Sequence, residues 1–563
     1  MMRSERIRTV LCVLLIFVAA LIQFSVSVKQ RAQWFGEAQI SMAGWFTAGT
    51  CVCARNWYLE GPWTLRFGMY WAPDSIETDL ESREPYVSFP PGSILPVYLL
   101  AKIRGHEPTI PMVMRYNLFN QCCVAVVLGL LAFAVARRMN FSRGVACIFA
   151  MIPPTLYIWF PVAFYEHEMG YFSDQAIILP FALYAFLEVL RTANVSSKRA
   201  RRLGWIQGVI AFFGVLTDWL FIPVLFCAWL LRLFRAEFGR KFWPILARSV
   251  LFAMPVLLAL TLFTIQLHHL NGFNKISERF WMRTGLKEQK FQTKTGRSET
   301  YPMWKNLVAF PLDSQFWKRH IKSGFGKLGK PVILCCAGMV LAMALLLAAF
   351  RFRGKSAPPE LLLAAEISFF MLAPCLLYLH MFKEHSSFWL HSFTTLKFAL
   401  PLAIIPLVTV PALVLRLFQR PWLHWMGAAA VLLLACGWAW SLDELRMRSF
   451  PDRQKDHIPI GNFIASHTAY EDVVFSPDYS IADRPPQSVA YAKKLVYKIT
   501  DIQDIRNMVG HIPGEYRVCL FFQNIEKQKP LPWLEPLKRA AYEVFSEGDM
   551  RLYKIRKAEY LAL

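Results

Sequence analysis

Two acidic side chains stand where a membrane protein could use them for chemistry. Glu37 follows the apolar run Val10–Val28 after a short interval, and Asp174 stands directly before another apolar run. A carboxylate held beside a hydroxyl or amine can take its proton, so both residues are candidates for a general base. Each also has a structural interpretation: Glu37 as a surface acid near a helix start, and Asp174 as the cap of its helix.

Three histidines are further candidates for contacts with a substrate. His167 stands between two glutamates shortly before Asp174, whereas His385 and His391 lie in a later connector, with Lys397 nearby. Interfacial histidines that simply bond to water or headgroups are the alternative interpretation. The Glu-His-Glu sequence also suggests a metal, but alternate residues on a loop without a third or fourth ligand favour no metal site.

Cations concentrate in the segment 268–330. It contains thirteen Lys and Arg residues against four acids, a net charge of +9. Such a charge fits the binding of an anionic lipid phosphate, and general attraction to anionic headgroups explains it equally well. Lys318, Arg319 and Lys322 stand near an interfacial stretch and are the candidates for the phosphate site.

The composition places most of the chain in a membrane. Of its 563 residues, 55% are hydrophobic and 18% are charged. A chain of this composition has more apolar surface than one soluble domain can bury. The net charge of +23 is spread mostly over short clusters between apolar runs, so we expect no nucleic-acid partner. Most of the twelve cysteines lie inside apolar runs and predict no redox role.

Apolar runs long enough to cross a bilayer recur throughout residues 1–442. Nine of them are uninterrupted: 7–28, 111–136, 143–163, 174–191, 246–267, 331–350, 359–382, 396–415 and 421–442. The stretch 203–234 is broken by Thr217-Asp218, which would be costly in mid-membrane, so we divide it into two short spans that meet at the outer surface. The sequence therefore predicts a polytopic α-helical membrane protein with about eleven spans, the first of them retained.

The short connectors between these runs orient the chain. Five of them are basic and are therefore predicted to be cytoplasmic: 137–143, 191–202, 232–248, 351–355 and 416–420. The N-terminus is then cytoplasmic, and the segments 29–110, 268–330 and 443–563 lie outside. The last of these has strand-like pieces at Asp472–Ser476 and Tyr516–Phe522, which predict a small extracytoplasmic α/β domain.

The first outer segment carries the sharpest motifs. Tyr86-Val-Ser-Phe-Pro90-Pro91-Gly92 is a double-proline turn before an apolar stretch too short to span, and the residues from Gly36-Glu37 onward have a helical apolar face. Both predict helices along the membrane surface. Together with Asp174 at the outer end of the fourth span and the broken pair at Leu216–Trp219, they resemble GT-C glycosyltransferases, above all the protein O-mannosyltransferases and aminoarabinose transferases.

The resemblance implies an inverting transfer of a sugar from a polyprenyl-phosphate donor to a glycan, lipid or protein acceptor, without a cofactor, at the outer face of a bacterial-type plasma membrane. Glu37 and Asp174 would be the catalytic carboxylates, and Tyr86, Pro90 and Pro91 would shape the cavity. The family commonly has Asp-Glu after the first span, where this sequence has Gly36-Glu37. An alternative base is therefore a carboxylate of a later acidic run, which is otherwise a solvated loop: Asp74, Glu77, Asp79, Glu81 and Glu84.

Two other functions stay open. A transporter or a flippase for lipid-linked saccharides would need polar groups throughout its spans or broken helices paired between two halves. Acids inside the spans are scarce here, Glu188 and Glu366 being exceptions near the predicted cytoplasmic ends, and this favours an enzyme. The missing acid at Gly36 keeps a non-catalytic, degenerate transferase as the second alternative.

Overall fold

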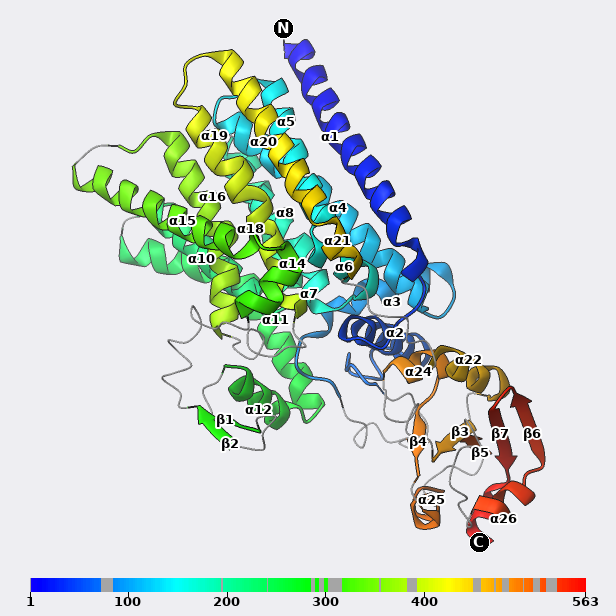
Figure 1. The fold of residues 1–563 in the computed structure, drawn as a ribbon. Coiled ribbons are helices and arrows are strands. Elements are labelled where there is room, and N and C mark those ends of the chain that lie inside the picture. The colour runs from blue at the N-terminus through cyan, green and yellow to red at the C-terminus, as the bar shows by residue number, and fades with distance from the viewer. Residues whose placement is uncertain are drawn as a thin grey trace.

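In the computed structural model, helices form a bundle, and a small sheet domain lies at the end opposite the N-terminus (Figure 1). The structure describes residues 2–71, 85–193, 196–239, 241–284, 289–292, 298–301, 316–353, 356–381, 392–448, 457–469, 472–477, 486–499, 501–509, 517–522 and 534–562. The acidic run 74–84 and the candidates His385 and His391 lie outside these ranges.

All eleven predicted apolar runs are helical. The helices are α1 (Met2–Arg31), α4 (Ile110–Arg138), α5 (Arg143–Trp159) with α6 (Pro161–Met169), α7 (Ser173–Ala176) with α8 (Ile178–Arg191), α9 (Ser197–Val215), α10 (Phe221–Phe234), α11 (Phe242–His269), α15 (Gly329–Phe352), α16 (Pro359–Met381), α18 (Ala399–Ile404) continued by η6 (Ile405–Thr409) and α19 (Val410–Leu415), and α20 (Pro421–Ser441). Within the described ranges, eight helices are long and apolar enough to cross a membrane, or nine if the bent pair α5–α6 is one span. The multi-pass architecture is confirmed, and the number eleven stays a prediction.

The stretch 203–234 forms two helices, as its polar break predicted. Asp218, in the turn between α9 and α10, lies 3.6 Å from Lys397 at the start of the α18 span. At the other end of α10, Arg232 lies 3.2 Å from Glu188, near the end of α8, and donates a hydrogen bond to Gln207 of α9. The two helices therefore run antiparallel, and their turn lies at the same end of the bundle as the start of α7.

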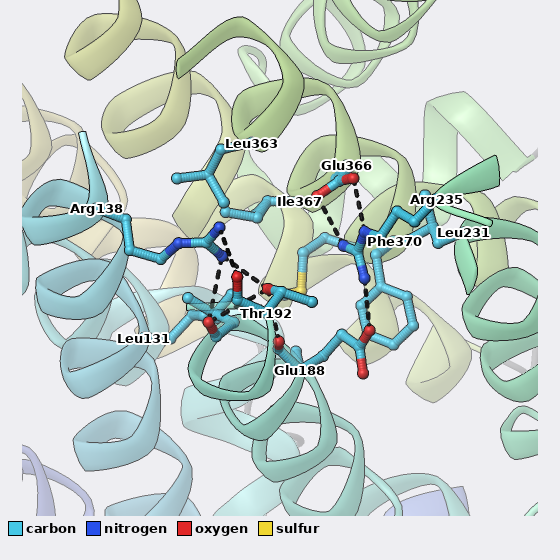
Figure 2. Close-up of a pocket in the computed structure, with 13 residues that line it drawn as sticks. Leu131, Arg138, Glu188, Thr192, Leu231, Arg235, Leu363, Glu366, Ile367 and Phe370 are labelled. Atoms are coloured by element: carbon cyan, nitrogen blue, oxygen red, sulfur yellow. Dashed lines mark hydrogen bonds and ion pairs between the residues drawn. The ribbon is translucent and has the colours of Figure 1, made fainter. Parts of the chain in front are cut away.

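Arginines of two basic connectors, 191–202 and 232–248, pair with the two intramembrane acids Glu188 and Glu366, and Figure 2 shows Arg235 bonded to both acids. Glu188 forms ion pairs with Arg191 at 2.7 Å, Arg232 at 3.2 Å and Arg235 at 2.8 Å. Arg235 also pairs with Glu366 at 2.7 Å, which joins α16 to the connector after α10. Charges buried in a low-dielectric bundle need partners, and here each acid has at least one guanidinium.

Helix α2 (Met42–Glu60) covers the opposite end of the bundle. The side chain of Ser41 caps it by accepting from the backbone N–H of Gly44, so the helix begins five residues after Glu37 rather than at Glu37 as predicted. Thr47 donates to the carbonyl oxygen of Met169, which ties α2 to the end of α6. The second predicted surface helix is present as α3 (Leu95–Arg104), directly after the double-proline turn, which forms η2 (Pro91–Ser93).

The predicted α/β tail is present as a five-stranded sheet. Its order is β4 (Val496–Lys498), β3 (Asp472–Ser476), β5 (Arg517–Phe522), β7 (Met550–Ile555) and β6 (Glu543–Glu547). The first three strands are parallel and the last two antiparallel. The helices of this region are α22 (His457–His467), α24 (Gln487–Ala492), α25 (Ile502–Val509), α26 (Leu534–Arg539) and α27 (Lys557–Ala562). Strand β3 is buried along its whole length, as the inner strand of a parallel sheet should be.

The sheet domain is fastened to the segment that carries Glu37. The backbone N–H of Ala38 donates to the hydroxyl of Tyr491 at 2.7 Å, and its carbonyl oxygen lies 2.8 Å from Nε2 of His457. Further along, Arg55 of α2 donates to the carbonyl oxygen of Lys493 at 2.7 Å. Helix α2 and the residues before it therefore lie between the bundle and the domain.

Candidate active site

Three buried charges meet at the α2 end of the bundle. The ammonium of Lys397 forms an ion pair with Asp174 Oδ1 and lies 3.6 Å from Asp218 Oδ2. All three side chains are at most 1% exposed. They come from distant parts of the chain: the first turn of α7, the turn between α9 and α10, and η5 (Ser392–Phe398).

The charges of this cluster do not balance, because one ammonium serves two carboxylates. Lys397 Nζ also lies 4.0 Å from the ring centroid of Tyr378, and Asp218 Oδ1 accepts the backbone N–H of Leu220 at 2.7 Å. Among the described residues, Oδ2 of Asp174 has no hydrogen-bond partner although it is buried. A buried acceptor without a partner is costly, so this one calls for an explanation.

The double-proline turn is bonded directly to the turn that holds Asp218. The backbone N–H of Gly92 donates to the carbonyl oxygen of Leu216 at 2.7 Å, and the indole of Trp219 donates to the carbonyl oxygen of Ser88 at 3.0 Å. A Cβ on Gly92 would overlap that carbonyl group of Leu216. Two motifs that resemble those of the GT-C enzymes, about 130 residues apart, thus form one structural unit beside the charged cluster.

Aromatic rings adjoin the charged cluster. Tyr86 meets Phe172 edge to face at 5.7 Å, and Phe46 of α2 stacks on Phe172 at 5.6 Å. Phe46 also meets Phe393 edge to face at 4.6 Å. Because Phe172 stands two residues before Asp174 and Phe393 is in the same short helix as Lys397, the rings separate the charges from α2. Tyr86 is thus part of this ring cluster, and its role in shaping a cavity stays a prediction.

Glu37 lies in an extended segment before α2, half-buried and beside the sheet domain. Burial raises the pKa of the nearby Tyr491 hydroxyl, and the negative charge of Glu37 adds to the rise. The preceding Gly36 has φ +91°, a backbone conformation that glycine adopts readily and aspartate rarely. The local backbone at this position therefore favours glycine over the aspartate of the Asp-Glu pattern that the resemblance led us to expect.

The Glu166-His167-Glu168 sequence lies buried in α6, and its side chains bond to separate partners. The ring nitrogens of His167 contact the Tyr157 hydroxyl at 2.6 Å and the side-chain oxygen of Asn117 at 2.9 Å. Glu166 accepts from Gln175, and Glu168 pairs with Arg31. Both ring nitrogens of His167 are therefore occupied, which contradicts the substrate contact predicted for it. Instead, the side chain links α6 to α5 and α4. In the part of the chain that is described, no group of three or more His, Cys, Asp or Glu side chains is arranged to hold a metal ion.

The basic segment 268–330 contributes one cation to a cavity beside the double-proline turn. The cavity of about 350 Å³ is lined on one side by Ser88 and Trp219, and on the other by α12 (Phe273–Thr284), including Arg279 and Trp281. Of the predicted phosphate ligands, Lys322 is exposed in α14 (Lys322–Phe325). Lys318 and Arg319 belong to η4 (Phe316–Ile321), and their side chains lie outside the described part. The remainder of the described segment is β1 (Gln289–Gln292) and β2 (Ser298–Tyr301).

Comparisons with known proteins show likeness in structure. No family model and no curated protein matches the sequence. The chain is similar to ArnT from Cupriavidus metallidurans in its apo state, with 12% identity and a TM-score of 0.44 over 97% of this chain and 98% of that one. The same protein bound to undecaprenyl phosphate aligns with 11% identity and a TM-score of 0.46, over 96% and 97%. The Archaeoglobus fulgidus oligosaccharyltransferase in its apo form aligns with 12% identity and a TM-score of 0.48, over 90% and 69%.

The sequence predicted only part of the charged cluster of Asp174, Asp218 and Lys397. Asp174 was singled out as catalytic. Asp218 was used to divide a span and as part of the broken pair at Leu216–Trp219, without a catalytic role, and Lys397 was noted as a neighbour of histidines. The polar break inside an apolar stretch was the available signal for Asp218, because a buried acid at a membrane edge needs a reason to be there. The role of Lys397 depends on the packing of residues 174, 218 and 397, which no local pattern reveals.

Proposed function

We propose that this protein transfers a sugar from a polyprenyl-phosphate donor to a glycan, lipid or protein acceptor at the end of the bundle where Asp174 lies. The observation that carries the proposal is the cluster of Asp174, Asp218 and Lys397, which is bonded through one turn to the double-proline motif. The basic connectors at the other end favour an extracytoplasmic position for this cluster, in a plasma membrane of bacterial type.

Asp174 is the better candidate for the general base. Its Oδ2 lacks a hydrogen-bond partner among the described residues, while Lys397 pairs with Oδ1 and holds the carboxylate in place. The acceptor oxygen or nitrogen would attack the anomeric carbon while the bond from that carbon to the phosphate oxygen breaks, and Asp174 would receive the acceptor proton. Such a single displacement inverts the anomeric centre. Asp218, which also faces Lys397, would keep the ammonium in place.

The leaving group would be the polyprenyl phosphate, and it would need cations rather than an acid. The cavity beside Trp219 suits such a group, because its lining is largely apolar and Arg279 provides a guanidinium for phosphate oxygens. The exposed Lys322, with Lys318 and Arg319 just before it in the chain, remains a further candidate for this contact. Glu37, held by the sheet domain, would face the acceptor and is the second candidate for the base.

Transfer and donor binding can be tested separately. Undecaprenyl phosphate serves as the probe for donor binding, measured by native mass spectrometry of the protein in nanodiscs. Transfer is measured with a panel of undecaprenyl-phosphate sugars incubated with membranes of matched expression. We expect Asp174→Asn to abolish transfer while binding of undecaprenyl phosphate persists, and Arg279→Gln to weaken that binding.

The matched control is Glu444→Gln, an acid-to-amide change at a side chain that is 77% exposed in α21 (Asp443–Arg448). It should leave both binding and transfer unchanged. Glu37→Gln distinguishes the two base candidates, because only the base should lower transfer by several orders of magnitude while binding persists. If neither Asp174→Asn nor Glu37→Gln lowers transfer, the proposed site is wrong.

A further inference from the structure

A hydrophobic groove runs between α1, α4 and α8, away from the charged cluster. Its volume is about 650 Å³. Its walls are almost entirely apolar and include Phe17 and Phe24 of α1, Phe119 and Val126 of α4, and Leu183 of α8. Helix α1 is loosely attached here, since only 11% of its most apolar window is buried within the protein. The groove therefore faces the interior of the bilayer.

The length of the groove matches one leaflet. Along α4 it extends from Arg115 to Val127, twelve residues, or roughly 18 Å at about 1.5 Å of rise per residue. The hydrocarbon core of a bilayer is about 30 Å thick, so the groove covers about half of it. Arg115 lies near the beginning of α4, at the same end as α2 and the sheet domain, so the leaflet is the one on the side of the charged cluster.

Among the described residues that line this groove, Arg115 is the one cation. Arg115 is exposed, and its guanidinium carbon lies 5.7 Å from the ring centroid of Phe35. The segment that carries Gly36 and Glu37 is also attached to α4, because the backbone N–H of Gly36 contacts the sulfur of Met114 at 3.0 Å. A guanidinium at headgroup depth can bind two phosphate oxygens at once.

We propose that this groove binds one acyl chain of an anionic phospholipid, with the lipid phosphate at Arg115. A chain that ends in mid-bilayer fits a groove of this length, whereas a polyprenyl chain of many isoprene units would exceed it. The bound chain fills the space between α1 and the bundle. It thereby supports the outer end of α1, where the buried Arg31 reaches across to Glu168 at 3.2 Å. This proposal does not depend on the proposed sugar transfer.

The test uses the full-length protein in nanodiscs that contain phosphatidylglycerol with a photoreactive diazirine in the middle of its acyl chain. Peptide mass spectrometry locates the crosslinks. We expect them to concentrate on Phe119, Cys122 and Val126, well above those on Leu257 and Leu258, which are exposed on α11. An even distribution over these helices would overturn the proposal.

Variants separate the chain site from the headgroup site. Cys122→Trp should fill the groove and abolish its crosslinks, while the crosslinks on α11 persist. Arg115→Gln should lower the preference of the groove for phosphatidylglycerol over phosphatidylcholine roughly fivefold, since one cation near a membrane surface contributes about that factor. Arg104→Gln, at another exposed cation of the same end, is the control and should change nothing. Equal effects of the two arginine variants, or displacement of the crosslinks by equimolar undecaprenyl phosphate, would contradict the assigned occupant.

Discussion

Replacing Lys397 by methionine tests the charged cluster most directly. Methionine has a similar length and no charge, so Lys397→Met leaves Asp174 and Asp218 together without their counter-ion in a site that is at most 1% exposed. Removing one partner of a buried ion pair typically costs about 3–5 kcal/mol, and uptake of a proton by one carboxylate relieves part of this cost. We therefore expect a loss of about 3 kcal/mol and a severe loss of transfer, because Asp174 loses the cation that holds its carboxylate in place.

Thermal unfolding in nanodiscs, followed by tryptophan fluorescence, measures the loss of stability. An unfolding entropy of about 2.1 cal/mol/K per residue over the whole chain converts 3 kcal/mol into a fall in Tm of roughly 2–3 °C. The double variant Lys397→Met/Asp218→Asn should recover part of this fall, because it removes one of the two uncompensated carboxylates. Lys198→Met, at an exposed lysine near the start of α9, is the control. An unchanged Tm together with unchanged transfer in Lys397→Met would show that Lys397 is not the counter-ion of a catalytic carboxylate.

Three further substitutions test other parts of the structure. Gly92→Ala should lower both Tm and transfer, because its Cβ would overlap the carbonyl group of Leu216 and separate the two motif turns. Gly204→Ala, where the Cβ meets nothing within 4 Å and φ is not positive, is the control. Glu188→Gln should destabilise the bundle by about 3–5 kcal/mol, measured as a fall in Tm, while binding of undecaprenyl phosphate per folded molecule stays unchanged. Gly36→Asp should not improve transfer, because an aspartate at φ +91° costs about 1–3 kcal/mol; increased transfer would show that the missing acid limits the enzyme.

Much of the architecture followed from one-dimensional patterns. The lengths of the apolar runs predicted the helices, and the break at Thr217-Asp218 predicted a helical hairpin, because both are properties of a chain in a bilayer. Local patterns failed where the outcome depends on neighbours that are distant in sequence. The sequence predicted a substrate contact for His167, but Tyr157 and Asn117 occupy both of its ring nitrogens. Glu37 was placed in the helix, whereas Ser41 provides the stronger cap and starts the helix later.

The buried acids at the two ends of the bundle differ in how many cationic partners they have. This difference bears on the choice between an enzyme and a non-catalytic scaffold. At the end near the basic connectors, Glu188 alone has three arginine partners, and Glu366 has a bidentate one. The charges of this network are neutralised by one another. Its burial is therefore accounted for by a structural role. At the opposite end, one lysine serves both Asp174 and Asp218, and among the described residues Oδ2 of Asp174 has no hydrogen-bond partner. Folding stability alone would favour the balanced arrangement at both ends. The unbalanced cluster is therefore better explained by a reaction that uses a carboxylate.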